Sequence, residues 1–124
     1  MDFKKLPQTE LEVMNLIWSN EETLSTNEVA DIITLQKGWK AGTTSTLLKR
    51  LIKKDFLSAE KRGKQFYYFP KVEEKEYKSL ETKEFLKNIH GNSLTSLVSM
   101  LHDTKDLLSD DDLEKLDRMI KNRY

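Results

Sequence analysis

The sequence contains no cysteine, and this absence excludes several kinds of chemistry at once. Disulfide bonds, thiolate metal ligands and cysteine nucleophiles all require that residue. The two histidines, His90 and His102, do not have the spacing of metal ligands, and no Gly-rich phosphate loop is present. No Ser/His/Asp set is visible either. The sequence therefore indicates neither an enzyme nor a protein with a cofactor.

Long apolar segments are also missing. No segment is apolar over the length needed to cross a bilayer, and the N-terminus lacks the pattern of a signal peptide. We therefore expect a soluble protein, and the lack of cysteine fits the reducing cytoplasm. Hydrophobic residues are 37% and charged residues 34% of the 124 residues. This low apolar share predicts small bundles with much solvated surface, or burial that a second chain completes.

The formal net charge of zero conceals an uneven distribution along the chain. Residues 37–64 contain nine lysine and arginine residues against two acids, which gives +7. Residues 1–36 sum to −5, and residues 65–124 sum to −2. A basic region in a neutral protein is the pattern expected for a phosphate-backbone partner. A solvated lysine-rich surface is the alternative.

The spacing of apolar residues predicts three helices in the first half of the chain. The second helix begins at a capping box in which Ser25 is the N-cap and Glu28 lies three residues further on. The third helix runs over about residues 42–54. Residues 57–70 are rich in aromatic side chains around Gly63 and predict a β-hairpin. Three helices followed by a hairpin are typical of a winged helix.

The composition changes after residue 70 and predicts a second domain. Apolar residues at helical spacing predict three short helices there, with a break at Gly91 and an N-cap at Ser109. Such helices cannot enclose much of a core, so we expect residues 71–124 to form a dimerisation domain by pairing with a copy of themselves. Packing against the winged helix of residues 1–70 is the alternative. The expected dimer interface consists of Leu94, Leu97, Val98, Leu101, Leu113, Leu116 and Ile120.

The third predicted helix has small hydroxyl side chains at its start and basic side chains further along. A helical wheel places its leucines and Thr44 on one side and most of the hydroxyl and basic residues on the other. Short hydroxyl residues let a helix approach the base edges in the major groove, while cations bind phosphates beside it. The hydroxyl residues could instead serve the N-cap and first turn, which we expect for Thr44. The expected DNA-binding residues, with the hairpin tip included, are Gly42, Thr43, Ser45, Thr46, Lys49, Arg50, Lys53, Arg62 and Lys64.

These segments resemble the penicillinase and methicillin-resistance repressors of Gram-positive bacteria, the BlaI/MecI type. The resemblance is carried by TELEVMNLIW, STNEVADII, W-x(3)-TT-x-TLLKRLIKKDFL, RGKQFYYFPKV, TKEFLKNIHG and SLTSLVSML. It implies a mainly α fold with an N-terminal winged helix and a C-terminal helical dimerisation arm. It also implies a homodimer that binds a pseudo-palindromic operator in double-stranded DNA and represses resistance or related genes. The family's recognition-helix positions correspond to Gly42, Thr43, Ser45, Thr46, Lys49 and Arg50.

The resemblance further implies a mode of release. In this family a membrane-embedded zinc metalloprotease that senses β-lactams triggers cleavage of the repressor in a C-terminal helix. The corresponding bond here is Met100-Leu101, where the best-known members carry Asn-Phe. A place in the dimer core is the alternative role for Leu101.

Two other functions compete with a repressor of this type. One is a winged-helix regulator of another ligand-sensing family, such as the MarR type, and the other is a winged helix that binds only proteins. The MarR type usually places a helix before its winged helix, and only five residues precede Leu6 here.

Overall fold

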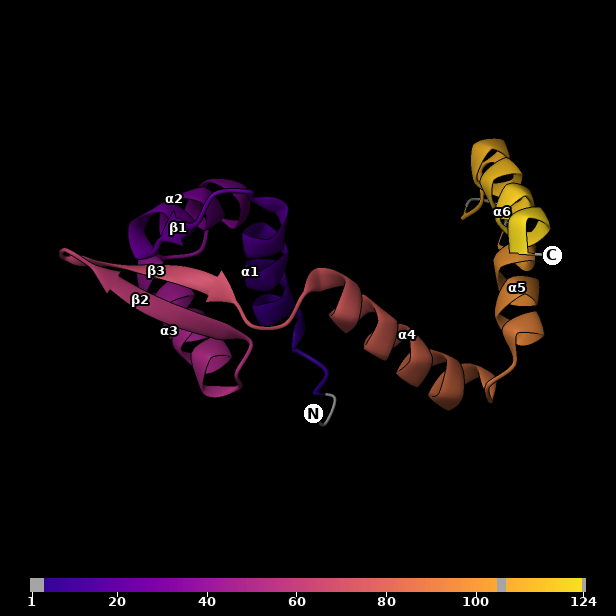
Figure 1. The fold of residues 1–124 in the computed structure, drawn as a ribbon, viewed down its shortest axis with the longest axis horizontal. Coiled ribbons are helices and arrows are strands. Elements are labelled where there is room, and N and C mark those ends of the chain that lie inside the picture. The colour runs from indigo at the N-terminus through magenta and orange to yellow at the C-terminus, as the bar shows by residue number, and fades with distance from the viewer. Residues whose placement is uncertain (1–3, 105–106, 124) are drawn as a thin grey trace. The chain divides into compact units, whose positions relative to one another are not determined.

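The computed structural model describes residues 4–104 and 107–123 (Figure 1). It divides into two compact units, Met1–Glu81 and Thr82–Tyr124. The described elements are mainly helices, with one small antiparallel sheet in the N-terminal unit. The predicted fold class, three helices followed by a hairpin in a mainly α chain, is confirmed.

Three helices form the body of the N-terminal unit. They are α1 (Gln8–Ser19), α2 (Thr26–Lys37) and α3 (Ala41–Lys53). The predicted capping box is present, because the Ser25 hydroxyl accepts a hydrogen bond from the Glu28 amide and the Glu28 carboxylate accepts one from the Ser25 amide. A left-handed residue, Gly38, ends α2.

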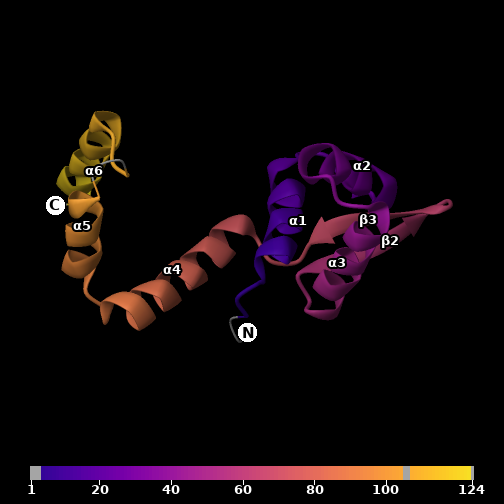
Figure 2. The ribbon, with the colours of Figure 1, turned by 180° about the vertical axis from the view of Figure 1, so that it is seen from behind.

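The sheet has three antiparallel strands in the order β1-β3-β2. They are β1 (Leu24–Ser25), β2 (Leu57–Arg62) and β3 (Gln65–Pro70). The hairpin of β2 and β3 turns through two residues, Gly63 and Lys64, and Gly63 has the positive φ of 65° that such a turn requires. The hairpin extends beyond the helices to a free tip (Figure 1, Figure 2). β1 was not predicted.

A single hydrophobic core joins the three helices to the sheet. Leu48 and Leu51 of α3 are 1% and 0% exposed, so one side of this helix is fully buried. Thr44 also faces the core, as predicted. The core includes Val13, Met14, Ile17, Val29, Ile33, Leu47, Leu57 and Tyr68. Because the leucine side of α3 packs into the core, the opposite side of the helix faces solvent.

The core of the N-terminal unit continues past the hairpin into α4 (Glu74–His90). Tyr77 is buried, and its hydroxyl oxygen accepts a hydrogen bond of 2.9 Å from the Leu6 amide. Its ring centroid lies 5.7 Å from that of Trp18 and 5.8 Å from that of Phe56. Burial raises the pKa of the Tyr77 phenol above its ordinary value. The first turn of α4 therefore belongs to the core of the N-terminal unit.

The C-terminal unit contains the end of α4 and two further helices, α5 (Leu94–Asp103) and α6 (Asp110–Arg123). The predicted break between α4 and α5 is present, with positive φ at Gly91 and Asn92. The predicted N-cap at Ser109 is confirmed, since its hydroxyl accepts a hydrogen bond from the Asp112 amide. Among the described residues after Glu81, none is buried. Residues 82–104 and 107–123 thus enclose no core of their own.

Within residues 4–104 and 107–123, every helix is too short or too polar to span a membrane.

Candidate nucleic-acid interface

The exposed side of α3 carries most of the residues that the sequence predicts to bind DNA. Burial of the leucines on the other side fixes which residues point outward. The outward set consists of Gly42, Thr43, Thr46, Lys49, Arg50 and Lys53, all exposed, with Ser45 half-buried at the border. The structure therefore brings hydroxyl groups and cations together on one surface, which we call the α3 face.

The hydroxyl groups at the start of α3 do not cap the helix. The N-cap residue is Lys40, and no side chain makes a capping hydrogen bond there. The Thr46 hydroxyl instead donates a hydrogen bond of 3.0 Å to the Gly42 carbonyl one turn earlier. This bond uses the single hydroxyl proton of Thr46, so the oxygen of this exposed side chain can still accept a hydrogen bond from a partner. None of these hydroxyl residues is thus the N-cap, while Thr43 and Thr44 are the third and fourth residues of α3.

Gly42 is not required by the backbone or by the packing of this unit. Its φ is not in the left-handed region, and a Cβ added there would meet nothing within 4 Å. A glycine inside a helix is less favourable than alanine. The residue leaves the backbone bare at the start of the α3 face, where a partner could approach closely.

Internal ion pairs neutralise only part of the basic region. Within residues 37–64, Lys37 pairs with Glu12 at 3.3 Å, Lys54 with Glu10 at 2.8 Å and Arg62 with Glu60 at 3.4 Å. No carboxylate of the described residues lies within 4.0 Å of the others, which are Lys40, Lys49, Arg50, Lys53, Lys61 and Lys64. These six cations are exposed and lie on or beside the α3 face and at the hairpin tip. Their charge is available to a polyanionic partner.

The two predicted cations of the hairpin tip, Arg62 and Lys64, have different surroundings. Lys64 occupies the turn and is exposed, as expected. Arg62, however, lies over the rings of Tyr67 and Phe69, with its guanidinium carbon 5.3 and 5.4 Å from their centroids. It also pairs with Glu60. Sequence position alone could not show that this cation turns back onto its own strands.

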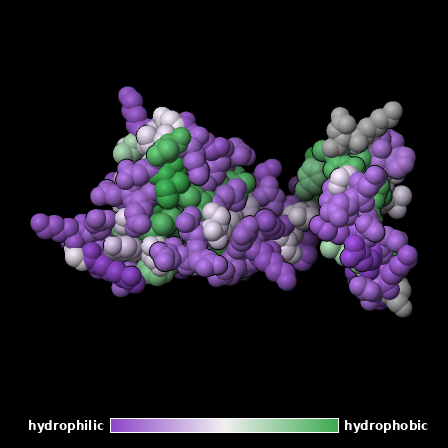
Figure 3. Space-filling model, turned by 90° about the horizontal axis from the view of Figure 1, so that it is seen from above, coloured by the Kyte–Doolittle hydropathy of each residue, from purple (hydrophilic) through white to green (hydrophobic). Residues whose placement is uncertain are grey.

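The predicted dimer residues form an apolar surface on the C-terminal unit. Leu94, Val98, Leu113, Leu116 and Ile120 are between 43% and 65% exposed, while Leu97 and Leu101 are half-buried. Part of this hydrophobic surface is visible in green in Figure 3. Phe85, Ile89 and Met119 are also exposed, although they were not predicted as interface residues.

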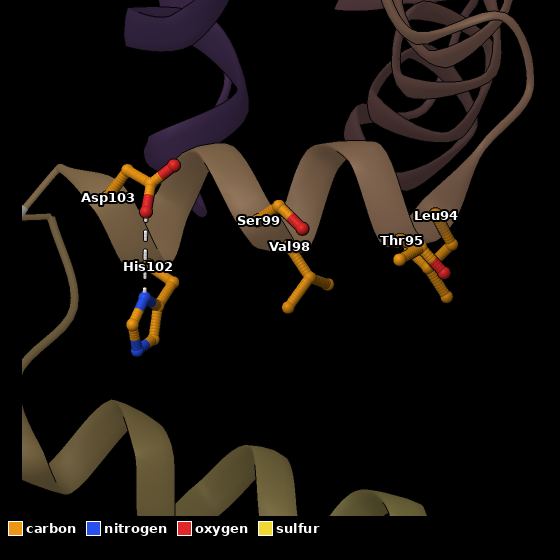
Figure 4. A pocket seen from close by; sticks show the side chains of 6 residues that line it. All are labelled: Leu94, Thr95, Val98, Ser99, His102 and Asp103. Atoms are coloured by element: carbon orange, nitrogen blue, oxygen red, sulfur yellow. Dashed lines mark ion pairs between the residues drawn. The ribbon is translucent and has the colours of Figure 1, made fainter.

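One side of α5 borders a hollow of about 530 Å³ (Figure 4). Leu94, Val98 and His102 project from α5 on this side, and Thr95, Ser99 and Asp103 complete the lining. The His102 ring lies beside Asp103, with 3.7 Å between Nδ1 and Oδ1. Apolar side chains on an open helix side are expected where another surface packs against them.

The predicted cleavage bond, Met100-Leu101, lies within α5. Met100 is 57% exposed, and its carbonyl accepts a hydrogen bond from the Thr104 amide, which closes the last turn of the helix. A protease would have to unwind this turn to reach the bond. In the described part of the chain, no group of three His, Asp or Glu side chains is arranged to hold a metal ion.

A three-helix core, an exposed hydroxyl-and-cation surface on the third helix and a basic hairpin tip together define a winged-helix DNA-binding protein. More particularly, the chain belongs to the penicillinase repressor family, whose family model matches residues 6–122. The resemblance to the BlaI/MecI repressors is thereby confirmed. This is a family of transcriptional repressors, and the expectation that the chain is not an enzyme agrees with that membership.

Two relatives match almost the whole chain. The methicillin resistance regulatory protein MecI of Staphylococcus aureus (strain N315) is 34% identical over 119 residues, which cover 96% of this chain and 95% of that protein. The penicillinase repressor of Bacillus licheniformis is 35% identical over 126 residues, which cover 97% of each. Both units of the chain therefore have counterparts in these relatives.

Two solved structures are also similar. The solution structure of the DNA binding domain of the repressor BlaI is 41% identical, with a TM-score of 0.52, and the match covers 60% of this chain and 94% of that one. The Bacillus licheniformis BlaI monomeric form, in complex with the blaP half-operator, is 37% identical, with a TM-score of 0.53. That match covers 61% of this chain and 92% of the other.

Proposed function

We propose that this chain acts as a homodimeric repressor that binds a pseudo-palindromic DNA operator and controls β-lactam resistance or related genes. The observation that carries the proposal is the set of six unpaired, exposed cations on and around the α3 face. Similarity to a BlaI structure in complex with a half-operator supports DNA as the partner.

In this proposal the α3 face enters the major groove. Thr43, Ser45 and Thr46 contact base edges, and the bare backbone at Gly42 allows the start of the helix to come close. Lys49, Arg50 and Lys53 bind phosphates along the groove walls, which positions the helix without reading sequence. The Lys64 ammonium adds a contact at the hairpin tip.

The apolar surface of the C-terminal unit supports self-pairing. Its exposed leucine, valine and isoleucine side chains are unfavourable in water and would be covered by the same surface of a second copy. A two-fold dimer presents two α3 faces to two half-sites, so the operator is expected to share that symmetry. Dimerisation also raises affinity, because binding of the second half-site becomes intramolecular.

Release is proposed to follow cleavage of Met100-Leu101 by a membrane-embedded sensor metalloprotease. Exposure of Met100 near the end of α5 is consistent with access after local unwinding. Cleavage there would separate α6 from α5 and divide the apolar surface, so the dimer and its affinity for the operator would be lost. A repressor that binds promoter DNA is expected to act in the cytoplasm.

The proposal can be tested by gel-shift titration on a palindromic fragment of the regulated promoter. We expect Arg50→Ala and Thr46→Ala to weaken binding by roughly tenfold each, with Arg50→Ala also lowering the dependence of affinity on salt. Lys71→Ala is the matched control, because this exposed lysine of the same unit already pairs with Asp55. Wild-type affinity in both α3 variants would show that α3 is not the reading helix and would favour a winged helix that binds only proteins.

A further inference from the structure

The β2–β3 hairpin has two faces, and only one of them continues the buried side of the sheet. Strand pairing places Leu57, Ala59 and Lys61 on the same side as Phe66 and Tyr68. Leu57 and Tyr68 are 1% and 8% exposed because this side packs against the helices. We call it the helix-side face of the hairpin.

Beyond the core, the helix-side face ends in a pair of exposed residues. Lys61 lies directly opposite Phe66, one step before the turn. Phe66 is 46% exposed, although the neighbouring aromatic residue of this face, Tyr68, is buried. Lys61 is exposed and has no carboxylate of the described residues within 4.0 Å. An apolar ring and a free cation are thus presented side by side at the hairpin tip.

The opposite face of the tip is chemically different. Arg62, the residue after Lys61, points to this other face because side chains alternate along a strand. Its guanidinium lies over Tyr67 and Phe69 and 3.4 Å from a Glu60 carboxylate oxygen. The charge of Arg62 is therefore already engaged by groups of the hairpin itself, and its side chain is directed back along the strands.

We propose that Lys61 and Phe66 join Lys64 in the DNA-contacting surface of the hairpin, and that Arg62 is not part of this surface. The inference rests on the proposed function and assigns residues that the sequence analysis did not select. The helix-side face is continuous with the sheet side against which α3 packs, so this pair and the α3 face lie on the same side of the hairpin. The occupant that matches both groups is the sugar–phosphate backbone flanking the half-site. The Lys61 ammonium binds a phosphate, and the Phe66 ring packs on a deoxyribose at the edge of the minor groove.

The test uses the full-length protein on an operator fragment, with gel-shift titration and hydroxyl-radical footprinting. Phe66→Ala and Lys61→Ala are each expected to lower affinity by roughly fivefold to tenfold and to remove protection of sugars flanking the half-site. Arg62→Ala is the matched control, since it removes a cation from the next position of the same strand. We expect it to keep the footprint and to change affinity by less than about twofold.

Phe66→Leu guards against a folding effect, because it keeps an apolar side chain while removing the ring. It should melt at the wild-type temperature and still lose flanking protection. The inference is overturned if Phe66→Ala and Lys61→Ala keep the wild-type footprint while Arg50→Ala loses binding, and the proposed function then still stands. It is equally overturned if Arg62→Ala alone loses the flanking protection. If Arg50→Ala also binds like the wild type, the proposed function fails together with the inference.

Discussion

The ammonium of Lys54, the C-cap residue of α3, lies 2.8 Å from Oε1 of Glu10 in the first turn of α1 and donates a hydrogen bond of 3.0 Å to Oε2. Glu10 is only 2% exposed, so its carboxylate is almost wholly removed from water. Such a charge is tolerated because the cation is held beside it. The pair ties the end of the DNA-binding helix to the first helix of the core.

We expect Lys54→Met to lower the free energy of unfolding of the N-terminal unit by about 2–3 kcal/mol, because it leaves the Glu10 carboxylate buried without its cation. The partial exposure of Lys54 reduces the effect, since water screens the charge of the pair. Urea denaturation followed by tryptophan fluorescence measures this, since Trp18 and Trp39 both lie in this unit. The double variant Glu10→Gln/Lys54→Met should recover much of the loss. Equal stabilities of Lys54→Met and wild type would contradict a structural role for the pair.

Thr44 is a buried position at which one substitution is expected to raise the free energy of unfolding. Its side chain is fully buried, and among the described residues its hydroxyl has no hydrogen-bond partner. Valine has the same shape without the polar group, so Thr44→Val is expected to raise the free energy of unfolding by about 1 kcal/mol. Thr44→Ser keeps the hydroxyl and loses the methyl group, and it should lower stability. Thermal melting compares the three proteins, and parallel losses in both variants would be the contrary result.

Tyr77 makes the stability of the N-terminal unit sensitive to alkaline pH. Burial raises the pKa of its phenol above the ordinary value of 10.0, so the unfolded chain loses this proton first. The stabilisation is therefore fully present below pH 10.0 and is lost as the pH rises through the higher pKa of the folded state.

Tyr77→Phe separates this effect from other titrations. At pH 7 we expect it to be less stable by about 1 kcal/mol, because the Leu6 amide loses its hydrogen-bond acceptor. Above pH 10.0 the difference between the two proteins should shrink, since phenylalanine cannot ionise. Urea titrations at several pH values measure the difference, and a constant gap between the two proteins would argue against ionisation of Tyr77.

Gly42→Ala should change stability and DNA affinity in opposite directions. The added methyl group meets no neighbour, and alanine is the better helix former, so the variant should be more stable by about 0.5 kcal/mol. Operator affinity should fall by about tenfold, because the methyl group stands between the α3 backbone and the base edges. Melting and gel-shift titration test the two parts. Unchanged affinity would mean that the start of α3 does not approach the bases.

Val98→Lys places a charge on the apolar surface of α5, where Val98 is 52% exposed. We expect a monomer in sedimentation equilibrium and a large loss of operator affinity, because the second half-site no longer binds intramolecularly. The tryptophan-monitored melt should stay unchanged, since no described residue after Glu81 is buried. Ser79→Lys adds the same charge at an exposed position of α4 and should remain dimeric. A dimeric Val98→Lys protein would exclude this surface as the interface.

The helices and the hairpin could be predicted because their signals are local. The spacing of Leu47, Leu48 and Leu51 identifies both α3 and the side of α3 that faces outward. By contrast, β1 is two residues long and exists only through pairing with Tyr67 and Tyr68, far along the chain. No periodicity can develop over so short a segment, which is why the sequence analysis missed it.

The sequence could not predict which cations form ion pairs or ring contacts, because the partners lie on other helices or depend on strand register. Lys37 and Lys54 are neutralised by Glu12 and Glu10, which lie on another helix. Arg62 is engaged by ring contacts that depend on strand register. The change of composition after Pro70 likewise marks the end of a strand, whereas the core extends to Tyr77. The division into domains at residue 70 stays a prediction.

The hydrogen bond from Thr46 to the Gly42 carbonyl limits which bases the α3 face can recognise. With its single proton committed to the helix, this side chain offers a base only an acceptor and a methyl group. It can accept a hydrogen bond from the amino group of adenine or cytosine, or contact the methyl group of thymine. It cannot donate a hydrogen bond to the carbonyl oxygen of guanine. Thr46 can therefore act only as a hydrogen-bond acceptor toward DNA, and the base that it contacts in the operator should rarely be guanine.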